Sequence, residues 1–443
     1  MKLSVVGLQF GDEGKGNIER YIQKHRMYLP SGEKYNYIAR YHGGANAGES
    51  WDLDGEIIVS HQVPVGVGTD IYAVFLSGGV INPKRLAKEI DYLRSKGIGV
   101  DSGTYGISGR NQVVLLHHLM DEEKAEESEG AVRFGTTRSG ISTAYASAAR
   151  KIGMTFAEFV GPNFETILIE RILPAVRKFY GSRMDIPPLE IYIEEYGEIR
   201  DRLKEFLRSE AELMEELGMK DSNVILAGCQ SIGLDVYNGA NRFSSSSVTT
   251  RYPLDADLRI GVMKLVQSAV GDRRATGNRK WITYDERITQ ELRGTKEDEG
   301  IEVGKTTGRP RDLGFCDAVL IRNNVKIARI GIVAATKIDR TGKLIEVLGT
   351  NRIPICTAYK YKGSFLRDLP EDSWVIEECE PVYTEFEVDP SNFTDIERLR
   401  EKRDFSELSD KNQEFFDRMG EEIGARIDIL STGPYCDNKI IRA

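Results

Sequence analysis

The chain has 443 residues, of which 40% are hydrophobic and 29% charged, and its formal net charge is −9. This composition is typical of globular proteins and excludes a chain that is disordered throughout. The acidic balance argues against extended contacts with phosphate backbones, so we expect no nucleic-acid partner. Apolar runs stay below the roughly 18 residues of a membrane span, and the N-terminus lacks the apolar length of a signal peptide. We therefore expect a cytoplasmic protein that does not contact membranes.

The cysteines and histidines favour no metal motif of a known pattern. The five cysteines are scattered and form no C-x-x-C pair, which argues against a zinc ribbon and against a disulfide framework. The five histidines form no H-E-x-x-H arrangement, so a metalloprotease is not indicated.

The predicted elements alternate between strands and helices along the chain. An apolar run at residues 3–7 stops at a glycine loop, and residues 17–24 follow as a helix. Further strands are predicted at residues 57–59, 73–76, 113–116, 224–227, 330–335 and 427–430, with a solvated acidic stretch at 121–129. Helices are predicted from Pro83 onward, over 190–218 and within 395–427.

This alternation predicts an α/β fold in which a large, mostly parallel central sheet is wrapped by helices. No composition change marks a linker, so we expect a single domain over residues 1–443, with a helical excursion at about 190–220.

The first glycine loop reads Gly11-Asp12-Glu13-Gly14-Lys15-Gly16. Glycines allow backbone amides to approach phosphate oxygens, and a lysine at a helix N-terminus adds positive charge there. The loop is only P-loop-like, because the common G-x-x-x-x-G-K-[ST] pattern requires glycine at Gln9 and a hydroxyl at Gly16. Asp12 is then the nearest oxygen ligand for Mg²⁺. A glycine turn alone is as often structural as functional.

A second loop, Tyr41-His42-Gly43-Gly44-Ala45-Asn46-Ala47-Gly48-Glu49, indicates a second wall of an anion-binding cleft. The segment from Gly7 to Gly16 fits G-x-Q-[WF]-G-D-E-G-K-G, and here the sequence resembles the adenylosuccinate synthetase family, GTP-dependent ligases that join aspartate to IMP. Other segments similar to that family follow in its order: 60–66, 78–83, 135–145, 227–230, 243–247, 306–311, 336–339 and 431–434.

The resemblance implies purine biosynthesis in a homodimer that uses GTP, an IMP-like nucleotide, L-aspartate and Mg²⁺. Asp12 would be the base at purine N1 and, with Gly48, a Mg²⁺ ligand, while Lys15 and Glu49 complete the implied catalytic set. The implied GTP-binding residues are Gly14, Lys15, Gly16, Gly48, Lys337, Asp339, Ser431 and Gly433. The implied purine-nucleotide residues are Asn46, Thr137, Lys151, Gln230 and Ser245. The implied aspartate-binding residues are Thr306, Thr307, Arg309 and Arg311, of which the two arginines suit a dicarboxylate.

Glu49 departs most from the family, which has a histidine at that position as an acid toward O6. A carboxylate adds negative charge where a phosphoryl group is transferred. Glu49 is then protonated or neutralised by a cation such as Mg²⁺, Arg138 or Lys151. Alternatively His42 or His61 takes over the role, or the reaction is altered or lost.

Two further departures bear on the substrate. Arg138 replaces a glycine beside the expected purine-nucleotide phosphate, and Lys151, next to Arg150, aligns with the arginine that the family supplies across its dimer interface. A viral branch, 2-aminoadenylosuccinate synthetase, acts on dGMP and tends to carry a smaller residue at the position of Asp12. The retained Asp12 favours an IMP-like purine. A dGMP-using relative and a catalytically silent GTP-binding homologue remain the alternatives.

Overall fold

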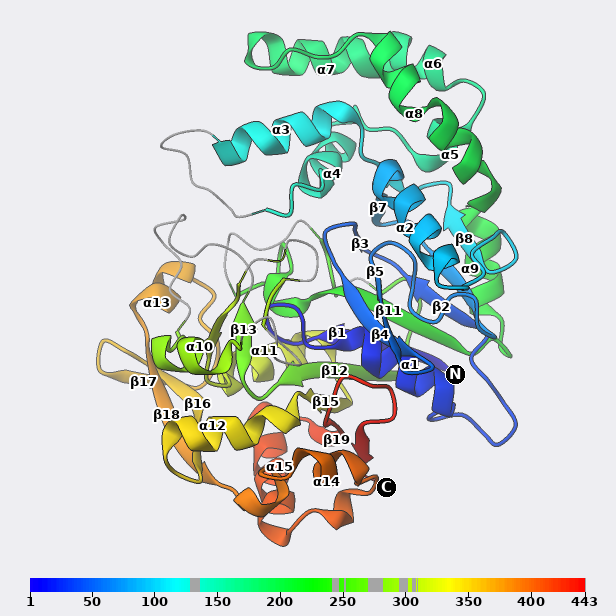
Figure 1. Cartoon of the computed structure of the whole chain (residues 1–443). Helices are drawn as coiled ribbons and strands as arrows, with labels where there is room; N and C mark the ends of the chain where they lie inside the picture. The colour runs from blue at the N-terminus through cyan, green and yellow to red at the C-terminus, as the bar shows by residue number, and fades with distance from the viewer. Residues whose placement is uncertain are drawn as a thin grey trace.

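A ten-stranded sheet forms the centre of the computed structural model, which describes residues 1–127, 136–240, 247–250, 252–269, 282–294, 302–304, 308 and 310–442 (Figure 1). Its spatial order is β10-β8-β6-β2-β11-β1-β12-β15-β19-β20. The strands in that order are Leu207–Arg208, Tyr105–Ser108, Tyr72–Phe75, Tyr37–Arg40, Val224–Ser231, Lys2–Gly7, Leu258–Lys264, Ile332–Thr336, Arg426–Ser431 and Lys439–Ile441.

The sheet is parallel except at one edge, where β20 runs antiparallel to β19. Strand β1 lies in the middle, paired with β11 on one side and β12 on the other. Leu3, Val5 and Val6 of β1 are fully buried, as expected of a parallel strand that helices cover on both faces. The predicted fold class, a large and mostly parallel sheet wrapped by helices, is confirmed.

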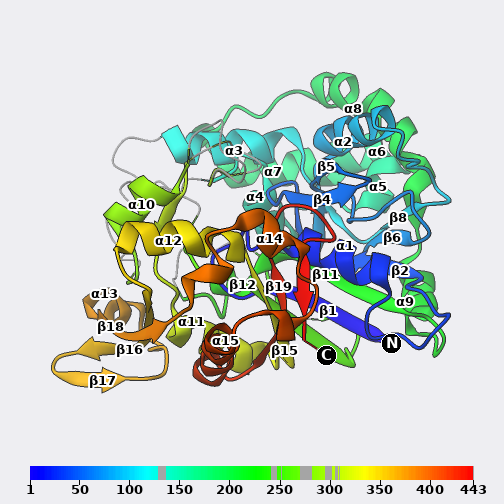
Figure 2. The ribbon, with the colours of Figure 1, turned by 60° about the horizontal axis from the view of Figure 1, so that its bottom comes forward.

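Helices cover both faces of this sheet, and Figure 2 shows α1 and α15 on opposite sides of it. Ile18 and Ile22 of α1 share a core with Val5, whereas Phe416 of α15 belongs to the core that contains Val6. The helices are α1 Lys15–His25, α2 Pro83–Ser95, α3 Leu116–Glu127, α4 Ile141–Ala149, α5 Phe156–Val160, α6 Phe164–Ile167, α7 Leu173–Tyr180, α8 Leu189–Leu203, α9 Glu210–Gly218, α10 Glu286–Leu292, α11 Ala318–Ala328, α12 Thr341–Leu348, α13 Ser373–Glu378, α14 Ile396–Glu401 and α15 Asp410–Ile423.

Smaller sheets surround the central one. They have the orders β3-β7-β9, β4-β5, β13-β14 and β17-β16-β18. Their strands are β3 Gly43–Gly44, β4 Glu49–Leu53, β5 Glu56–Ser60, β7 Gly79–Ile81, β9 Gln112–Val113, β13 Gln267–Ala269, β14 Asp312–Gly314, β16 Arg352–Tyr361, β17 Ser364–Leu366 and β18 Glu380–Glu387. Of these, β4 and β5 form the antiparallel hairpin that carries Glu49.

The predicted strands at 3–7, 73–76, 224–227, 330–335 and 427–430 lie in the central sheet, with ends shifted by one to four residues. The strand predicted at 113–116 is wrong. Only Gln112–Val113 is extended, and Leu116 begins α3, which also contains most of the stretch predicted as solvated and acidic. An apolar run of four residues cannot distinguish a strand from a buried helix start, and Leu115 and His118 are buried in either case.

Residues 57–59 form a strand, but in the small β4-β5 sheet, where Ile57 is exposed. The helices predicted over 190–218 are α8 and α9, and the short strand β10 between them pairs with β8 at the edge of the central sheet. Across the described ranges, none of the helices combines the length and the apolar character needed to cross a membrane.

Candidate active site

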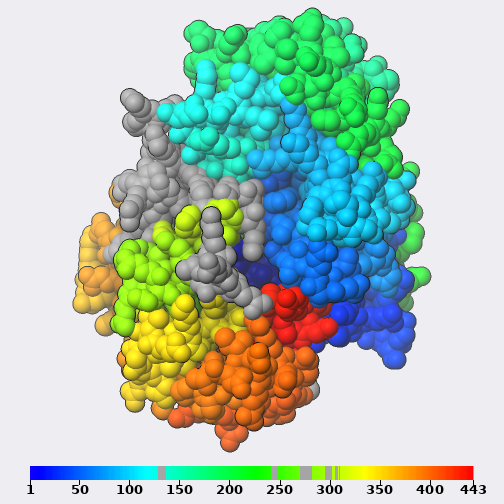
Figure 3. Space-filling model, in the orientation of Figure 1, coloured from blue at the N-terminus to red at the C-terminus, as the bar shows by residue number. Residues whose placement is uncertain are grey.

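The predicted site segments follow the carboxyl ends of neighbouring parallel strands. The loop before α1 follows β1, residues 41–48 follow β2, and Lys337 follows β15. Gln230 is the second-last residue of β11, and Ser431 is the last residue of β19. Open parallel sheets bind ligands at this edge. Figure 3 shows the surface hollowed here, with the dark-blue start of the chain visible beside the red C-terminal segment.

The loop from β1 to α1 leaves the start of α1 open to an anion. Gly14 is the N-cap with φ 84°, a conformation that favours glycine, and no side chain caps the helix. Gly16 lies where a Cβ atom would be 3.1 Å from Glu49 Cβ, so the first and second loops touch. Asp12 has φ 60°, a rare conformation for a residue other than glycine and one found at functional sites.

Glu13 holds this loop together from the inside. Its carboxylate accepts hydrogen bonds from the amide of Gly11 (2.9 Å) and the hydroxyl of Ser231 (2.7 Å), and forms an ion pair with Lys15 (3.0 Å). Burial alone would raise the pKa of Glu13, but Lys15 and these hydrogen bonds bring it below the usual value. The predicted phosphate-binding Lys15 thus lies inside the loop with its charge balanced.

Glu49 forms a buried ion pair with Arg40, the last residue of β2. Arg40 is completely buried and Glu49 nearly so, with 4% of its side chain exposed. Arg40 is therefore the counter-ion of Glu49. Arg138 and Lys151, the side chains that we expected to neutralise Glu49, are both exposed. A carboxylate engaged by a buried arginine suits a counter-ion better than a group that faces the substrate.

His42 and His61, the alternative proton donors, differ in their surroundings. The His42 ring is buried, and neither nitrogen has a hydrogen-bond partner among the described residues. Burial, together with the positive charges of Arg40 and Lys15, lowers the pKa of His42 to about 3, so the ring is neutral. The Nδ1 atom of His61 lies 3.0 Å from the carbonyl oxygen of Ala47 in the second loop.

Arg85 of α2 joins the second loop to the segment expected to hold the purine nucleotide. Its guanidinium donates to the Ser139 hydroxyl (2.6 Å), the Thr137 carbonyl (3.5 Å) and the Ala45 carbonyl (3.4 Å). Thr137 and Asn46 therefore lie on two segments that Arg85 connects. Gln230 is close to the same loop, because a Cβ atom at Gly43 would lie 3.8 Å from Gln230 Cγ.

A second group of charged side chains surrounds Glu302, near the ends of β12 and β15. Its carboxylate contacts Lys337, Lys264 (3.4 Å) and Arg311 (3.6 Å). Burial would raise the pKa of Glu302, but Lys264 and Lys337 hold it at about 2. Burial lowers the pKa of Arg311 to about 9 and that of Lys337 to about 7.

Arg311 also forms an ion pair with Asp12. This contact brings the predicted base together with a predicted aspartate-binding residue from 299 positions further along the chain. The two functions that the sequence assigns to these residues would therefore be carried out at neighbouring points of one site.

The residues expected to bind guanine meet at Arg400 of α14. Its guanidinium lies 3.6 Å from Asp339 and donates to the carbonyl of Thr432 (3.3 Å). Burial raises the pKa of Asp339, against the lowering effect of Arg400. Gly433 lies against Arg400, since a Cβ atom there would be 2.8 Å from Arg400 Nε and that side chain would have to move. The loop after β19 is fixed to α1 by a hydrogen bond from Asn17 to the Pro434 carbonyl (2.6 Å).

Four predicted site residues lie outside the described residues: Ser245, Thr306, Thr307 and Arg309. Lys151 is exposed and has φ 64° at the end of α4, next to Arg150, whose guanidinium lies over the ring of Phe179 (4.1 Å). Sequence reasoning missed Arg40, Arg85, Glu302 and Arg400. Single charged residues between motifs give no local signal, and only the fold brings them to the site.

The fold and this site define a nucleotide-using α/β enzyme with a glycine loop for phosphate at the end of its central strand. The model of the family "Adenylosuccinate synthetase" matches residues 4–440. The adenylosuccinate synthetase of Staphylococcus epidermidis is 31% identical over 442 residues, covering 97% of this chain and 96% of that protein. The chain belongs to the adenylosuccinate synthetase family, whose members are ligases that form a C–N bond.

Two solved structures are similar. The fully ligated adenylosuccinate synthetase of Plasmodium falciparum has a TM-score of 0.84 at 23% identity, with 100% of this chain and 99% of that chain covered. The succinoaminodeoxyadenylate synthetase of cyanophage S-2L, bound to dGMP and to dATP as an energy donor, has a TM-score of 0.57 at 14% identity, with 99% and 95% covered. At these identities both comparisons bear on the fold alone.

Proposed function

We propose that this chain is a GTP-dependent ligase that joins L-aspartate to an IMP-like 6-oxopurine nucleotide through a 6-phosphoryl intermediate, giving adenylosuccinate, GDP and phosphate. The observation that carries the proposal is the contact between Asp12, on the phosphate loop, and the buried Arg311. The contact supports the proposal because the residue expected to act as the base then lies beside one expected to bind a carboxylate. We further propose that the enzyme is a cytoplasmic homodimer, in which Arg150 or Lys151, directly after α4, contributes to the partner's site.

The first half of the reaction uses Asp12. Its carboxylate removes the proton from purine N1, and the electron density that moves to O6 allows this oxygen to attack the γ-phosphorus of GTP. The O6–P bond forms as the bond to the β-phosphate breaks, and GDP leaves. The open N-terminus of α1 supplies amides to the phosphates, and the ion pair of Lys15 with Glu13 keeps the loop before this helix in shape.

The second half uses Arg311. L-aspartate binds before the first half begins: one of its carboxylates takes the place of Asp12 on this guanidinium and so frees Asp12 for the purine. The neutral amine of L-aspartate then attacks C6, the C6–O6 bond breaks, phosphate leaves with O6, and the nitrogen gives up one proton to the departing phosphate. Orientation of the amine by an arginine clamp is the main contribution that the chain makes to this step.

The oxygen donors here suit Mg²⁺, because Asp12 offers a partly exposed carboxylate and Gly48 a backbone carbonyl on the facing loop. These two residues would hold the ion, which supplies positive charge to the phosphates of GTP. On the purine side, we propose that Asn46, Thr137 and Gln230 hold the nucleotide, and that Asp339 with Lys337, Ser431 and Gly433 binds guanine.

The test is phosphate release from GTP with L-aspartate and one of IMP, dIMP, GMP or dGMP. We expect release with IMP or dIMP that depends on aspartate and is lost in Asp12→Asn. Release with dGMP alone would instead favour the 2-aminopurine branch. Absence of release with every purine, at measurable GTP binding, would favour the silent homologue.

A further inference from the structure

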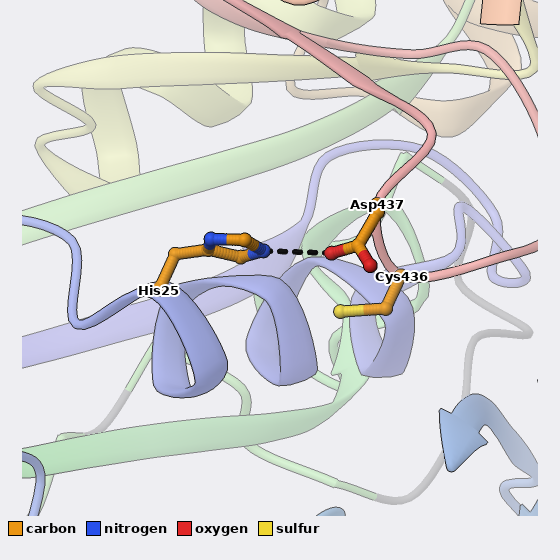
Figure 4. A group of neighbouring side chains, drawn as sticks. All are labelled: His25, Cys436 and Asp437. Carbon is orange, nitrogen blue, oxygen red and sulfur yellow. Dashed lines mark hydrogen bonds and ion pairs between the residues drawn. The ribbon is translucent and has the colours of Figure 1, made fainter. Parts of the chain in front are cut away.

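Within the part of the chain that the structure describes, three metal-binding side chains converge away from the reacting groups: His25, Cys436 and Asp437 (Figure 4). Their ligand atoms all lie within 4.8 Å of one another, and His25 Nε2 is 2.7 Å from Asp437 Oδ1. His25 is the last residue of α1, whereas Cys436 and Asp437 belong to the loop between β19 and β20. The group therefore joins the helix that follows the phosphate loop to the loop that carries Gly433.

The donors suit a different ion from the one that the reaction uses. A thiolate, an imidazole and a carboxylate form a typical ligand set for Zn²⁺, whereas Mg²⁺ prefers oxygen alone. Ligand atoms around tetrahedral Zn²⁺ lie about 3.3–3.6 Å apart. The three side chains therefore need to move by about 1 Å or less, which the half-exposed His25 and Asp437 allow.

The burial pattern is that of a site with an open side. Cys436 is completely buried, while 42% of His25 and 49% of Asp437 are exposed. The thiol thus lies at the floor, and the fourth position of a bound ion faces water.

Positive charges oppose an ion here: Lys439 Nζ donates to the Cys436 carbonyl (3.1 Å), and Lys24 and Arg20 also act on Cys436. Lys24 Nζ lies 2.8 Å from Asp437 Oδ2, on the oxygen that does not contact His25. A metal bound at Oδ1 leaves this ion pair in place, so that Lys24 orients the carboxylate from outside while reducing the affinity by charge repulsion.

We propose that His25, Cys436 and Asp437 bind one Zn²⁺-like transition-metal ion, with water as the fourth ligand, and that this ion fixes the end of α1 to the loop between β19 and β20. This loop is already bound to α1 by the hydrogen bond from Asn17 to Pro434 and by one from Lys439 to Asn17 (3.2 Å). The ion therefore strengthens a contact on which the proposed guanine site depends.

The test is a titration of the full-length protein with Co²⁺, as a coloured substitute for Zn²⁺, in buffer that contains Mg²⁺. We expect one equivalent to bind, with the charge-transfer absorption of a cobalt–thiolate bond. Cys436→Ser should remove this absorption. His25→Ala, which alters an exposed ring and leaves the core intact, should weaken binding by about 10–100-fold or more.

Asp437→Asn should also weaken binding, and Asp70→Asn is its matched control. Asp70 is likewise an exposed carboxylate, paired with Lys34 at 3.6 Å. Asp70→Asn should leave the Co²⁺ affinity unchanged. Lys24→Gln should tighten binding by about two- to fivefold, the scale of an exposed charge pair. Failure to bind Co²⁺, or binding that is unchanged in both His25→Ala and Cys436→Ser, would overturn the proposal.

Discussion

The two sides of the candidate site balance their charges in different ways. On the side of β2, two buried ion pairs join residues close in sequence, Lys15 with Glu13 and Arg40 with Glu49, while the buried Glu19 of α1 has no hydrogen-bond partner among the described residues. On the side of β12 and β15, Glu302 is surrounded by Lys264, Lys337 and Arg311 from separate parts of the chain. Asp12 lies at the boundary and pairs across it with Arg311.

This difference indicates on which side the charge pairs keep their arrangement when ligands bind. Pairs within one loop are fixed as soon as the loop forms, and breaking them leaves a buried charge without a counter-ion. Pairs between distant segments can be exchanged for a charged ligand without disturbing the fold locally. We infer that the side proposed to bind phosphate is preorganised, whereas the side proposed to bind aspartate and guanine holds contacts that substrates would replace.

The largest effect is expected at the boundary. Asp12→Asn should reduce turnover by about 10²–10⁴-fold, the usual scale for one acid–base group, because the amide cannot remove the N1 proton. The free energy of unfolding should change little, since Arg311 keeps Glu302 as a second partner. Steady-state phosphate release and urea denaturation measure the two quantities. Turnover near that of the unmodified protein would show that Asp12 is not the base.

The sequence predicted the preorganised side more completely than the other. Gly14, Lys15 and the glycines of the second loop are contiguous motifs, and the strand–loop–helix pattern around them leaves few alternatives. Arg40 was missed because it is a single arginine at the end of a strand, and nothing local pairs it with Glu49, nine residues away. Glu302 and Arg400 were missed for the same reason over longer separations. The strand order around β1 brings these segments together. It likewise cannot be predicted from any one segment.

A second prediction concerns the Arg40–Glu49 ion pair on the phosphate side. Arg40→Met leaves the Glu49 carboxylate buried without its counter-ion and should cost about 3–5 kcal/mol of unfolding free energy. Adding Glu49→Gln should recover part of this loss, because the remaining group is then neutral. Arg202→Met is the control, since Arg202 pairs with Asp91 at the exposed surface and should cost less than about 1 kcal/mol. Equal effects of Arg40→Met and Arg202→Met in urea denaturation would contradict the buried pair.

Glu49→Gln alone distinguishes a counter-ion from a proton donor. A counter-ion role predicts a loss of about 3–5 kcal/mol in stability, because the buried Arg40 then lacks its counter-ion, with turnover within about tenfold of normal. If turnover falls by about 10²-fold or more while stability is unchanged, Glu49 donates the proton that a histidine donates elsewhere in the family.

A third prediction concerns the exchangeable side. Asp339 should select guanine, because its carboxylate can accept from N1–H and the 2-amino group, whereas adenine offers neither in that geometry. Asp339→Asn should reduce the preference for GTP over ATP by about 10–100-fold. The kcat/KM values for the two nucleotides measure this ratio. Equal use of GTP and ATP by the unmodified protein would rule out Asp339 as the selecting group.

The smallest effect should come from His42, on the preorganised side. The pKa of this buried ring is about 3, against about 6.5 in the unfolded chain. Between these values the unfolded chain binds a proton that the folded protein does not, so stability falls as the pH falls. One such group contributes about 1.4 kcal/mol per pH unit. His42→Gln should therefore reduce the slope of unfolding free energy between pH 6 and 5 by about this amount.

His117 provides the matched comparison for that slope. It is also buried with a pKa of about 3, but its ring contacts the Tyr192 hydroxyl of α8 (3.0 Å). His117→Gln should reduce the slope equally and leave GTP affinity unchanged, whereas His42→Gln should alter both, since His42 lies beside Arg40 and Lys15 at the phosphate loops. If the slope is the same with and without His42, the ring is protonated in the folded protein. The phosphate side would then hold one more positive charge than its carboxylates balance.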